Sequence, residues 1–385
     1  MRPHALVALV VALLAFAPEG EAVEPVGEWL AGDLHLHTTY SHDSYGGPGD
    51  DNTEVEEAYT AGLTVQQQFA VAASRGLDYL AITDHNDLRS QDDPGFGSLG
   101  VVGVSGYENS LDGHAQMLGA DRIYDNGVGV QALADGLRAD GGAFQINHPR
   151  EGGEEDWGPG HEIVPDTVEV WNISRLYQPP LPSASDNDAA IRFWEGFLDA
   201  GHHVAATGGS DSHWASTVPI QGAGSPTTWV FATDRSEAGI LEGIRAGRTS
   251  ISARPPGQGG ARIFLEADAD GDGAFEAMVG DTVPAGALLR VRVEGAAGAE
   301  LRIITTGGEL TFAPIPVTSP LFEHRFGLGA ATWVRADVAR PDLAEQRRAL
   351  CGDQSTYCRN LLLVEAMTSP LYFESGPADA ASSAA

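Results

Sequence analysis

The chain has 385 residues, with 54 acidic side chains against 22 basic ones and a formal net charge of −32. A hydrophobic fraction of 42% is enough for a folded core, which excludes a wholly disordered chain. The acidic balance and the absence of a basic run predict no binding to nucleic acid. Because all the basic residues are arginines, Schiff-base chemistry through a lysine amine is excluded as well.

The first 22 residues have the form of a secretory signal peptide. Arg2 precedes an uncharged, apolar stretch over 5–17, and small residues follow it up to Ala22. This stretch is too short to span a bilayer, and no cysteine lies near its end to carry a lipid anchor. We therefore expect cleavage after Ala22, a secreted or periplasmic protein, and no membrane anchor.

Short β-rich runs alternate with helical patterns between residues 30 and 250. Strands are expected over 33–37, 77–83, 101–107, 143–147, 167–171, 203–207 and 228–232. Helices are expected over 65–75, 130–138, 187–200 and 236–245. This alternation predicts a parallel β/α architecture, either a barrel or a doubly wound sheet.

A segment rich in proline and glycine, 253–261, indicates a domain boundary. The β-like runs 262–266, 288–294, 300–306, 332–338 and 361–367 follow it, separated by turn signals. They predict an antiparallel β-sandwich domain over 262–375.

Three further segments carry weaker signals. Cys351 and Cys358, seven positions apart in an exported chain, predict one local disulfide. The acidic segment 268–276 resembles the start of a calcium loop, but Val279 stands where the last acidic ligand is needed, so an acidic hairpin turn is favoured. The small, polar residues 376–385 are expected to be a disordered tail.

Histidines and acids fall at or just after the expected strands. His35 and His37 lie two apart on one strand, so their rings project from the same face. In a parallel barrel the carboxyl ends of the strands open onto one face, so we expect these side chains to converge. Imidazole and carboxylate together suit zinc, manganese or iron. The residues of this pattern are His35, His37, His85, Glu108, His114, His148, Asp211 and His213.

Five short motifs resemble those of the PHP superfamily, which is named for polymerase and histidinol phosphatase domains. They are DLHLHTTYS at 33–41, ITDHN at 82–86, GYE at 106–108, NHP at 147–149 and GSDSH at 209–213. The resemblance covers residues 29–252. It implies a distorted seven-stranded β/α barrel that holds two or three divalent metal ions.

The resemblance also implies which side chains bind the ions. The first metal would take His35, His37, Glu108 and Asp211. Glu108 would bridge to a second metal that is completed by His114 and His148. A third would take His85, His213 and either Asp43 or His42, of which Asp43 is favoured. The export signal and the added β-domain further resemble the CehA/McbA-type branch, whose name comes from members that hydrolyse carbamate or amide bonds.

Two cations that share a carboxylate can hold a bridging hydroxide near neutral pH. The favoured function is therefore a metal-dependent phosphoesterase for a small-molecule substrate, with zinc as the first choice of metal. Glu108 and Asp211 would be catalytic, and Arg150 would contact the phosphate. One alternative is an aryl ester, carbamate or amide hydrolase, and another is a non-catalytic exported binding protein with structural metals. The sequence gives no indication of the oligomeric state.

Overall fold

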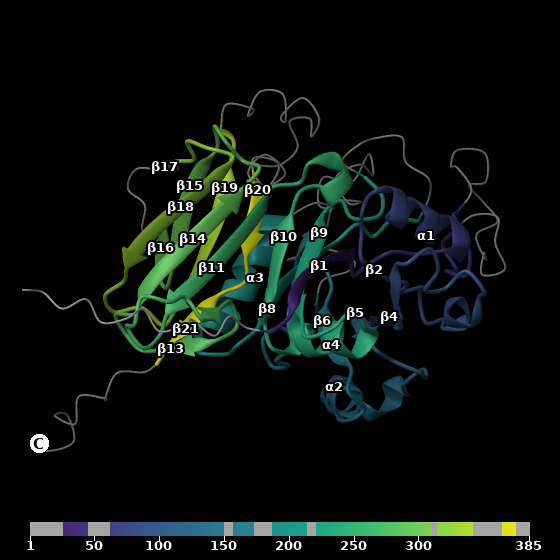
Figure 1. Cartoon of the computed structure of the whole chain (residues 1–385). Coiled ribbons are helices and arrows are strands. Elements are labelled where there is room, and N and C mark those ends of the chain that lie inside the picture. Colours follow the sequence, from purple (N-terminus) through teal and green to yellow (C-terminus); the bar gives the residue numbers. More distant parts are fainter. Residues whose placement is uncertain are drawn as a thin grey trace, which may run out of the picture.

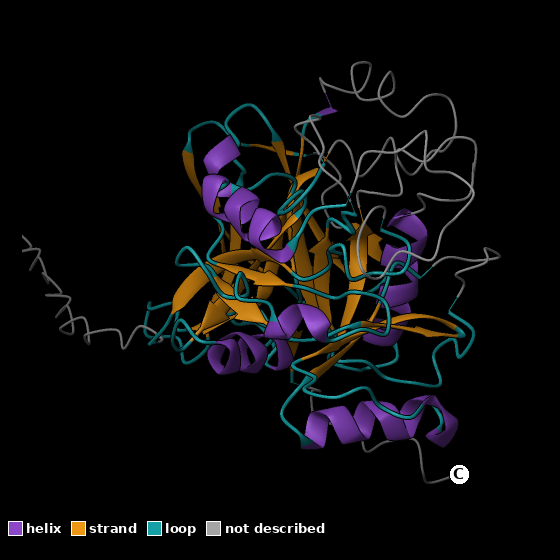
Figure 2. Ribbon diagram, turned by 90° about the vertical axis from the view of Figure 1, so that its right-hand side faces the viewer, coloured by secondary structure: helices purple, strands orange, loops and turns teal. Residues whose placement is uncertain are grey.

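A computed structural model describes residues 26–44, 62–149, 157–172, 187–213, 221–309, 314–341 and 364–374. In this part of the chain the protein is mixed α/β, with three sheets and few helices (Figures 1 and 2). None of the helices in these ranges is long and apolar enough to cross a membrane. The predicted signal peptide, cysteine pair, Arg150 and C-terminal tail all lie outside the described residues.

The largest sheet runs through both halves of the chain, in the order β13-β21-β19-β20-β10-β9-β1-β2-β3. In its first half β1, β2 and β3 are parallel, and β9 and β10 add antiparallel neighbours beside β1. β10 then pairs with β20, which follows the predicted domain boundary, so one sheet contains strands from both sides of that boundary. The bounds are β1 (Glu28–Asp33), β2 (Tyr79–Ala81), β3 (Val102–Val104), β9 (Thr227–Ala232), β10 (Thr249–Ser252), β13 (Thr282–Val283), β19 (Trp333–Ala339), β20 (Val364–Thr368) and β21 (Leu371–Phe373).

A second sheet has the order β4-β5-β6-β7-β8. Its first three strands are antiparallel and its last three are parallel. Two single bridges join it to the large sheet, one between Leu36 and Ser212 and the other between His85 and Glu108. The ends of β1, β2 and β8 therefore meet near the start of β4. The bounds are β4 (Glu108–Leu111), β5 (Gly113–Leu118), β6 (Ala143–Ile146), β7 (Thr167–Asn172) and β8 (Ala205–Gly209).

Four α-helices lie at the positions that the sequence predicts, to within one residue at each end. Thr64 begins the first helix with a capping box, because its hydroxyl accepts from the amide of Gln67 and the Gln67 side chain accepts from the amide of Thr64. Ser236 caps the last helix in a similar way, by accepting from the amide of Gly239. The helices are α1 (Val65–Ser74), α2 (Val130–Ala139), α3 (Asn187–Asp199) and α4 (Glu237–Arg245).

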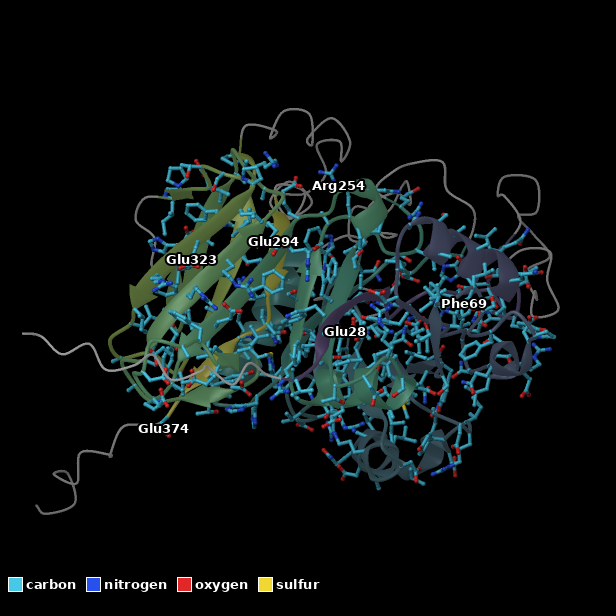
Figure 3. The ribbon with its side chains drawn as sticks, in the orientation of Figure 1. Glu28, Phe69, Arg254, Glu294, Glu323 and Glu374 are labelled. Carbon is cyan, nitrogen blue, oxygen red and sulfur yellow. The ribbon has the colours of Figure 1, made fainter. Side chains whose placement is uncertain are left out.

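A third sheet, in the order β12-β11-β14-β18, is antiparallel. Alternate residues of β14 are buried, as expected for a strand with one face on a core. This core also takes in side chains of β15 and β19, such as Ile303 and Val338. The opposite face is polar, and Figure 3 shows Glu294 and Glu323 on it. The remaining bounds are β11 (Arg262–Asp268), β12 (Ala277–Met278), β14 (Leu288–Glu294), β15 (Glu300–Thr305), β16 (Gly308–Glu309), β17 (Ile315–Pro316) and β18 (Leu321–Gly327).

Two strands that lead to the histidines and acids of the motifs differ from the sequence prediction. The strand expected over 33–37 ends at Asp33, because residues 35–37 leave the sheet and exchange backbone hydrogen bonds with Asp211 and Ser212. The strand expected over 101–107 ends at Val104, and Glu108 instead begins the β4–β5 hairpin, which the pattern did not predict. The acidic segment after Asp268 forms the turn between β11 and β12, as favoured from the sequence.

Candidate metal centre

Histidine and carboxylate side chains converge where the two bridged sheets meet. Every metal ligand expected from the sequence belongs to one connected cluster, although the residues are spread from 35 to 213 along the chain. Arg150, the remaining predicted site residue, lies outside the described residues. The members of the cluster are His35, His37, Asp43, His85, Glu108, His114, His148, Asp211 and His213.

Four of these side chains, His35, His37, Glu108 and Asp211, form site A. The two Nε2 atoms are 3.2 Å apart. Each lies 3.1 to 3.4 Å from Glu108 Oε2 and Asp211 Oδ1. A tetrahedron with metal–ligand bonds of about 2.0–2.1 Å has edges of about 3.3–3.4 Å, so the distances of the two nitrogens from each other and from the two oxygens are close to those edges. All four side chains are buried, with exposures of 2% or less.

The second oxygen of Glu108 faces another pair of imidazoles, which completes site B. Glu108 Oε1 lies 3.0 Å from His114 Nδ1 and 3.3 Å from His148 Nε2. The amide of Asn147 donates to the same oxygen at 2.8 Å. Glu108 therefore stands between sites A and B with one oxygen turned to each, as a bridging carboxylate requires.

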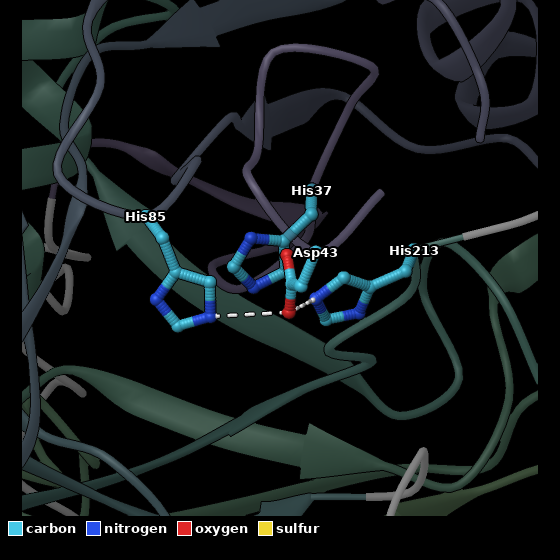
Figure 4. A group of neighbouring side chains, drawn as sticks. All are labelled: His37, Asp43, His85 and His213. Carbon is cyan, nitrogen blue, oxygen red and sulfur yellow. Dashed lines mark ion pairs between the residues drawn. The ribbon is translucent and has the colours of Figure 1, made fainter. Parts of the chain in front are cut away.

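Asp43, His85 and His213 form site C at the outer side of the cluster (Figure 4). Asp43 Oδ2 lies 2.8 Å from His213 Nε2 and 3.4 Å from His85 Nε2. The neighbouring His42 ring stands beside His85, with 5.0 Å between centroids. This geometry favours Asp43 as the ligand. Asp43 is 35% exposed, so site C is the most open of the three to solvent.

The charges in the cluster strongly shift one another's protonation. Burial lowers the pKa of His35, but the carboxylates of Glu169 and Glu108 outweigh this and hold that pKa well above its usual value. Burial raises the pKa of Glu108, but the neighbouring His35 and His114 outweigh it and hold the pKa well below its usual value. Protons on the histidines thus balance the buried carboxylates, and divalent cations would replace those protons.

Two supporting residues were given no role at the site from the sequence. Glu169 of β7 is fully buried, and its Oε1 lies 3.0 Å from Nδ1 of His35. Asn172, at the end of the same strand, donates to Asp211 Oδ2 at 3.1 Å. The sequence did carry a signal for Glu169, since it stands between Val168 and Val170 in a buried strand, where an unpartnered acid is costly.

The backbone is strained at the same place. Only four residues other than glycine have positive φ in the described ranges, and His148 (28°) and Asp211 (48°) are two of them. A third, Asn86 (50°), directly follows His85. Such conformations cost roughly 1–3 kcal/mol each and cluster at functional sites. Two of these residues, His148 and Asp211, have their side chains in the cluster.

Fold and site together define a mixed α/β protein with a buried histidine–carboxylate cluster suited to divalent metal ions. A family model described as a protein of unknown function (DUF3604) matches residues 25–91, which hold His35, His37, Asp43 and His85. No curated protein matches the chain. Among solved structures, the chain is similar to a two-domain protein from Bacteroides vulgatus that contains a predicted PHP-like metal-dependent phosphoesterase. The identity is 17% over 84% of this chain and 95% of that one, with a TM-score of 0.43.

Proposed function

We propose that this protein is a metal-dependent phosphoesterase of the PHP type. The observation that carries the proposal is the position of Glu108, whose two oxygens face site A and site B while site C lies alongside. When bound, divalent cations would lower the pKa of water and polarise the oxygen of the substrate. Zinc is the first choice because imidazole and carboxylate donors stand at tetrahedral spacing in site A.

The chain's own residues orient the donors. Asn147 donates to Glu108 Oε1, and Asn172 donates to Asp211 Oδ2, which leaves Asp211 Oδ1 directed at the two histidines of site A. The Nδ1 of His37 lies 3.1 Å from the hydroxyl of Ser41, which donates to Asp43 Oδ1 at 2.8 Å. These contacts hold sites A and C at a fixed separation. They preorganise the donor atoms before a substrate arrives.

A phosphomonoester fits three cationic positions better than a carbonyl ester does. Its transferring group spreads negative charge over three oxygens, whereas attack on a carbonyl develops charge on one. The net charge of −32 does not oppose this, because divalent ions dominate the local field. An aryl substrate would be favoured by exposed tryptophans beside the site, but Trp157, Trp171 and Trp194 are buried in the core.

The finer fold assignment belongs to the same proposal. The bridges at Leu36 and His85 connect β1, β2 and β4 through β8 into a ring of seven strands, which supports a distorted barrel over 29–252. The core shared between the third sheet and β15 and β19 supports a β-sandwich over 262–375. We further propose export after cleavage at Ala22, a small-molecule substrate, and no nucleic acid partner.

The purified protein should contain two or three equivalents of zinc, manganese or iron and should hydrolyse p-nitrophenyl phosphate. Dialysis against a chelator should abolish the activity, and added zinc or manganese should restore it. A chain that binds no metal would refute the proposal. Faster turnover of 1-naphthyl acetate than of phenyl phosphate would favour the carbonyl alternative, and complete inertness of a fully loaded sample would favour a binding protein.

A further inference from the structure

We propose that Glu169 is a positioning residue that sets the tautomer of His35 and ties site A to site B. This inference rests on the proposed function, because it concerns the same metal centre. Glu169 lies on β7 and contributes to none of the motifs that resemble the PHP superfamily. Its side chain is fully buried, so its carboxylate must find its partners inside the protein.

Glu169 contacts three segments of the chain that carry or support ligands. Its Oε1 lies 3.0 Å from His35 Nδ1. Its Oε2 accepts from the backbone amide of His148 and from the side-chain amide of Asn172, each at 3.2 Å. One carboxylate thus connects the segments after β1 and β6 to the end of β7.

The contact with His35 decides which ring nitrogen can bind a metal. An ionised carboxylate only accepts hydrogen bonds, so His35 must carry a proton on Nδ1 to bond to Glu169. A neutral imidazole has one such proton, so the lone pair of Nε2 would be available to a cation held between this nitrogen, Glu108 Oε2 and Asp211 Oδ1. A carboxylate behind a histidine ligand fixes the ring in this way at many metal sites.

The other contacts extend the effect to both sites. Asn172, held by Glu169, also donates to Asp211 Oδ2, so the ligand opposite His35 in site A depends on the same carboxylate. His148 belongs to site B, and its amide is held by Glu169 while its backbone takes a φ of 28°. Loss of Glu169 should therefore disturb donors of both sites.

A second interpretation is that Glu169 is itself a ligand. His35, His148 and Glu169 do offer donor atoms within 4.8 Å of one another. However, the Nε2 of His35 is directed into site A, and an ion at Glu169 would have to use the Nδ1 of the same ring. The two interpretations therefore assign opposite states to Nδ1, protonated in ours and metal-bound in the other.

The test compares Glu169→Gln and Glu169→Ala with the control Glu365→Gln. Glu365, on β20, is a suitable match because it is also buried, at 3% exposure, and because its described ion pairs are with Arg254 at 3.0 Å and Arg340 at 3.7 Å, which are not members of the metal cluster. Zinc affinity would be measured by competition with a chelator, and folding by circular dichroism. We expect the two Glu169 variants to bind zinc about 10–100-fold more weakly than the parent, and the control to stay within about twofold.

The tautomer is read independently of affinity and activity. In the zinc-loaded parent protein labelled with 15N-histidine, His35 should show a protonated Nδ1 and a metal-bound Nε2. That Nδ1–H signal should shift or broaden in Glu169→Gln. A metal-bound Nδ1 would overturn the inference, and so would unchanged affinity and spectra in a folded Glu169→Gln.

These outcomes separate the two proposals. A parent protein that binds none of zinc, manganese and iron refutes the proposed function, and the positioning role falls with it. A parent protein that binds zinc as strongly as Glu169→Gln refutes only the positioning role. If both Glu169 variants fail to fold, the spectrum of the parent still decides, because it reports directly which nitrogen of His35 holds the proton.

Discussion

Glu108 and His35 are 73 positions apart in the chain, yet Glu108 Oε2 and His35 Nε2 lie 3.1 Å from each other with both side chains buried. Burying such a pair costs desolvation energy, and removal of one partner leaves an uncompensated charge inside the protein. Glu108 also faces both His35 and His114. It is therefore the residue whose loss should have the largest effect.

Glu108→Gln keeps the shape of the side chain and removes its charge. We expect kcat/KM on p-nitrophenyl phosphate to fall about 10³-fold or more, which corresponds to about 4 kcal/mol of lost transition-state stabilisation. Elemental analysis should show at least one metal equivalent lost. The control is Glu237→Gln. Glu237 lies outside the cluster, and its carboxylate accepts a hydrogen bond of 2.7 Å from the backbone amide of Ser105. A full metal complement and the parent rate in Glu108→Gln would contradict the assignment.

Local signals explain why the helices were predictable. Thr64 with Gln67 and Ser236 with Gly239 place helix starts through contacts three residues apart, which a sequence displays directly. The end of β1 is different. Residues 35–37 leave the sheet because they pair with Asp211 and Ser212, and no pattern around His35 reports a partner so far along the chain.

The same contrast holds for the site. The candidate ligands could be chosen from the sequence because the motifs that contain them stand in a recognisable order. Glu169 and Asn172 lie outside those motifs, and only the folded structure brings them into contact with the candidate ligands His35 and Asp211. The pairing of β10 with β20, which joins strands from both sides of residue 253, is equally non-local. Contacts that depend on two distant segments are the part that sequence patterns leave undetermined.

Metal binding should be favoured by rising pH. The pKa of His35 is held well above 6.5 in the metal-free protein, so both ring nitrogens carry a proton at neutral pH, and the proton on Nε2 must leave before a metal can bind there. Calorimetry of zinc binding in buffers of different ionisation enthalpy should therefore show net proton release at pH 7. Affinity that is unchanged between pH 6 and 8 would contradict this.

The same groups predict opposite pH trends for stability with and without metal. A raised histidine pKa contributes stability that is complete below 6.5 and is lost as pH rises through the folded-state value. The lowered pKa of Glu108 contributes stability above 4.5 that is lost only as pH falls well below it. The chelated protein should thus lose stability as pH rises above 6.5. Over the same range zinc should bind more tightly and so stabilise the zinc-bound protein more. The difference in Tm between the zinc-bound and the chelated protein should therefore widen as pH rises above 6.5. A difference that stays constant with pH would contradict this prediction.

Site C should be the first to lose its ion. Asp43 is 35% exposed, whereas the ligands of site A are at most 2% exposed. We expect Asp43→Asn to lose one metal equivalent, to keep the others, and to lower activity on a phosphomonoester about tenfold or more. Elemental analysis and initial rates measure both effects.

His42→Asn is the matched variant, because it changes the residue beside Asp43 and is the other candidate ligand. It should retain the third metal and most of the activity, since the carboxylate of Asp43 already stands 2.8 Å from His213. The reverse pattern, with metal lost only in His42→Asn, would assign His42 to site C.

Gly209 at the end of β8 should not tolerate a methyl group. A Cβ there would lie 2.3 Å from the Cβ of His35 and 2.6 Å from Glu169 Oε1, so the β8 backbone or the ligand pair would have to move. We expect Gly209→Ala to lower the free energy of unfolding by about 2–3 kcal/mol and to weaken zinc binding at the same time. Gly327→Ala in β18 has nothing within 4 Å of the added carbon and should change the unfolding free energy by less than about 1 kcal/mol. Urea unfolding with and without chelator measures both. Equal behaviour of the two variants would mean that the close approach of β8 to His35 does not hold in solution.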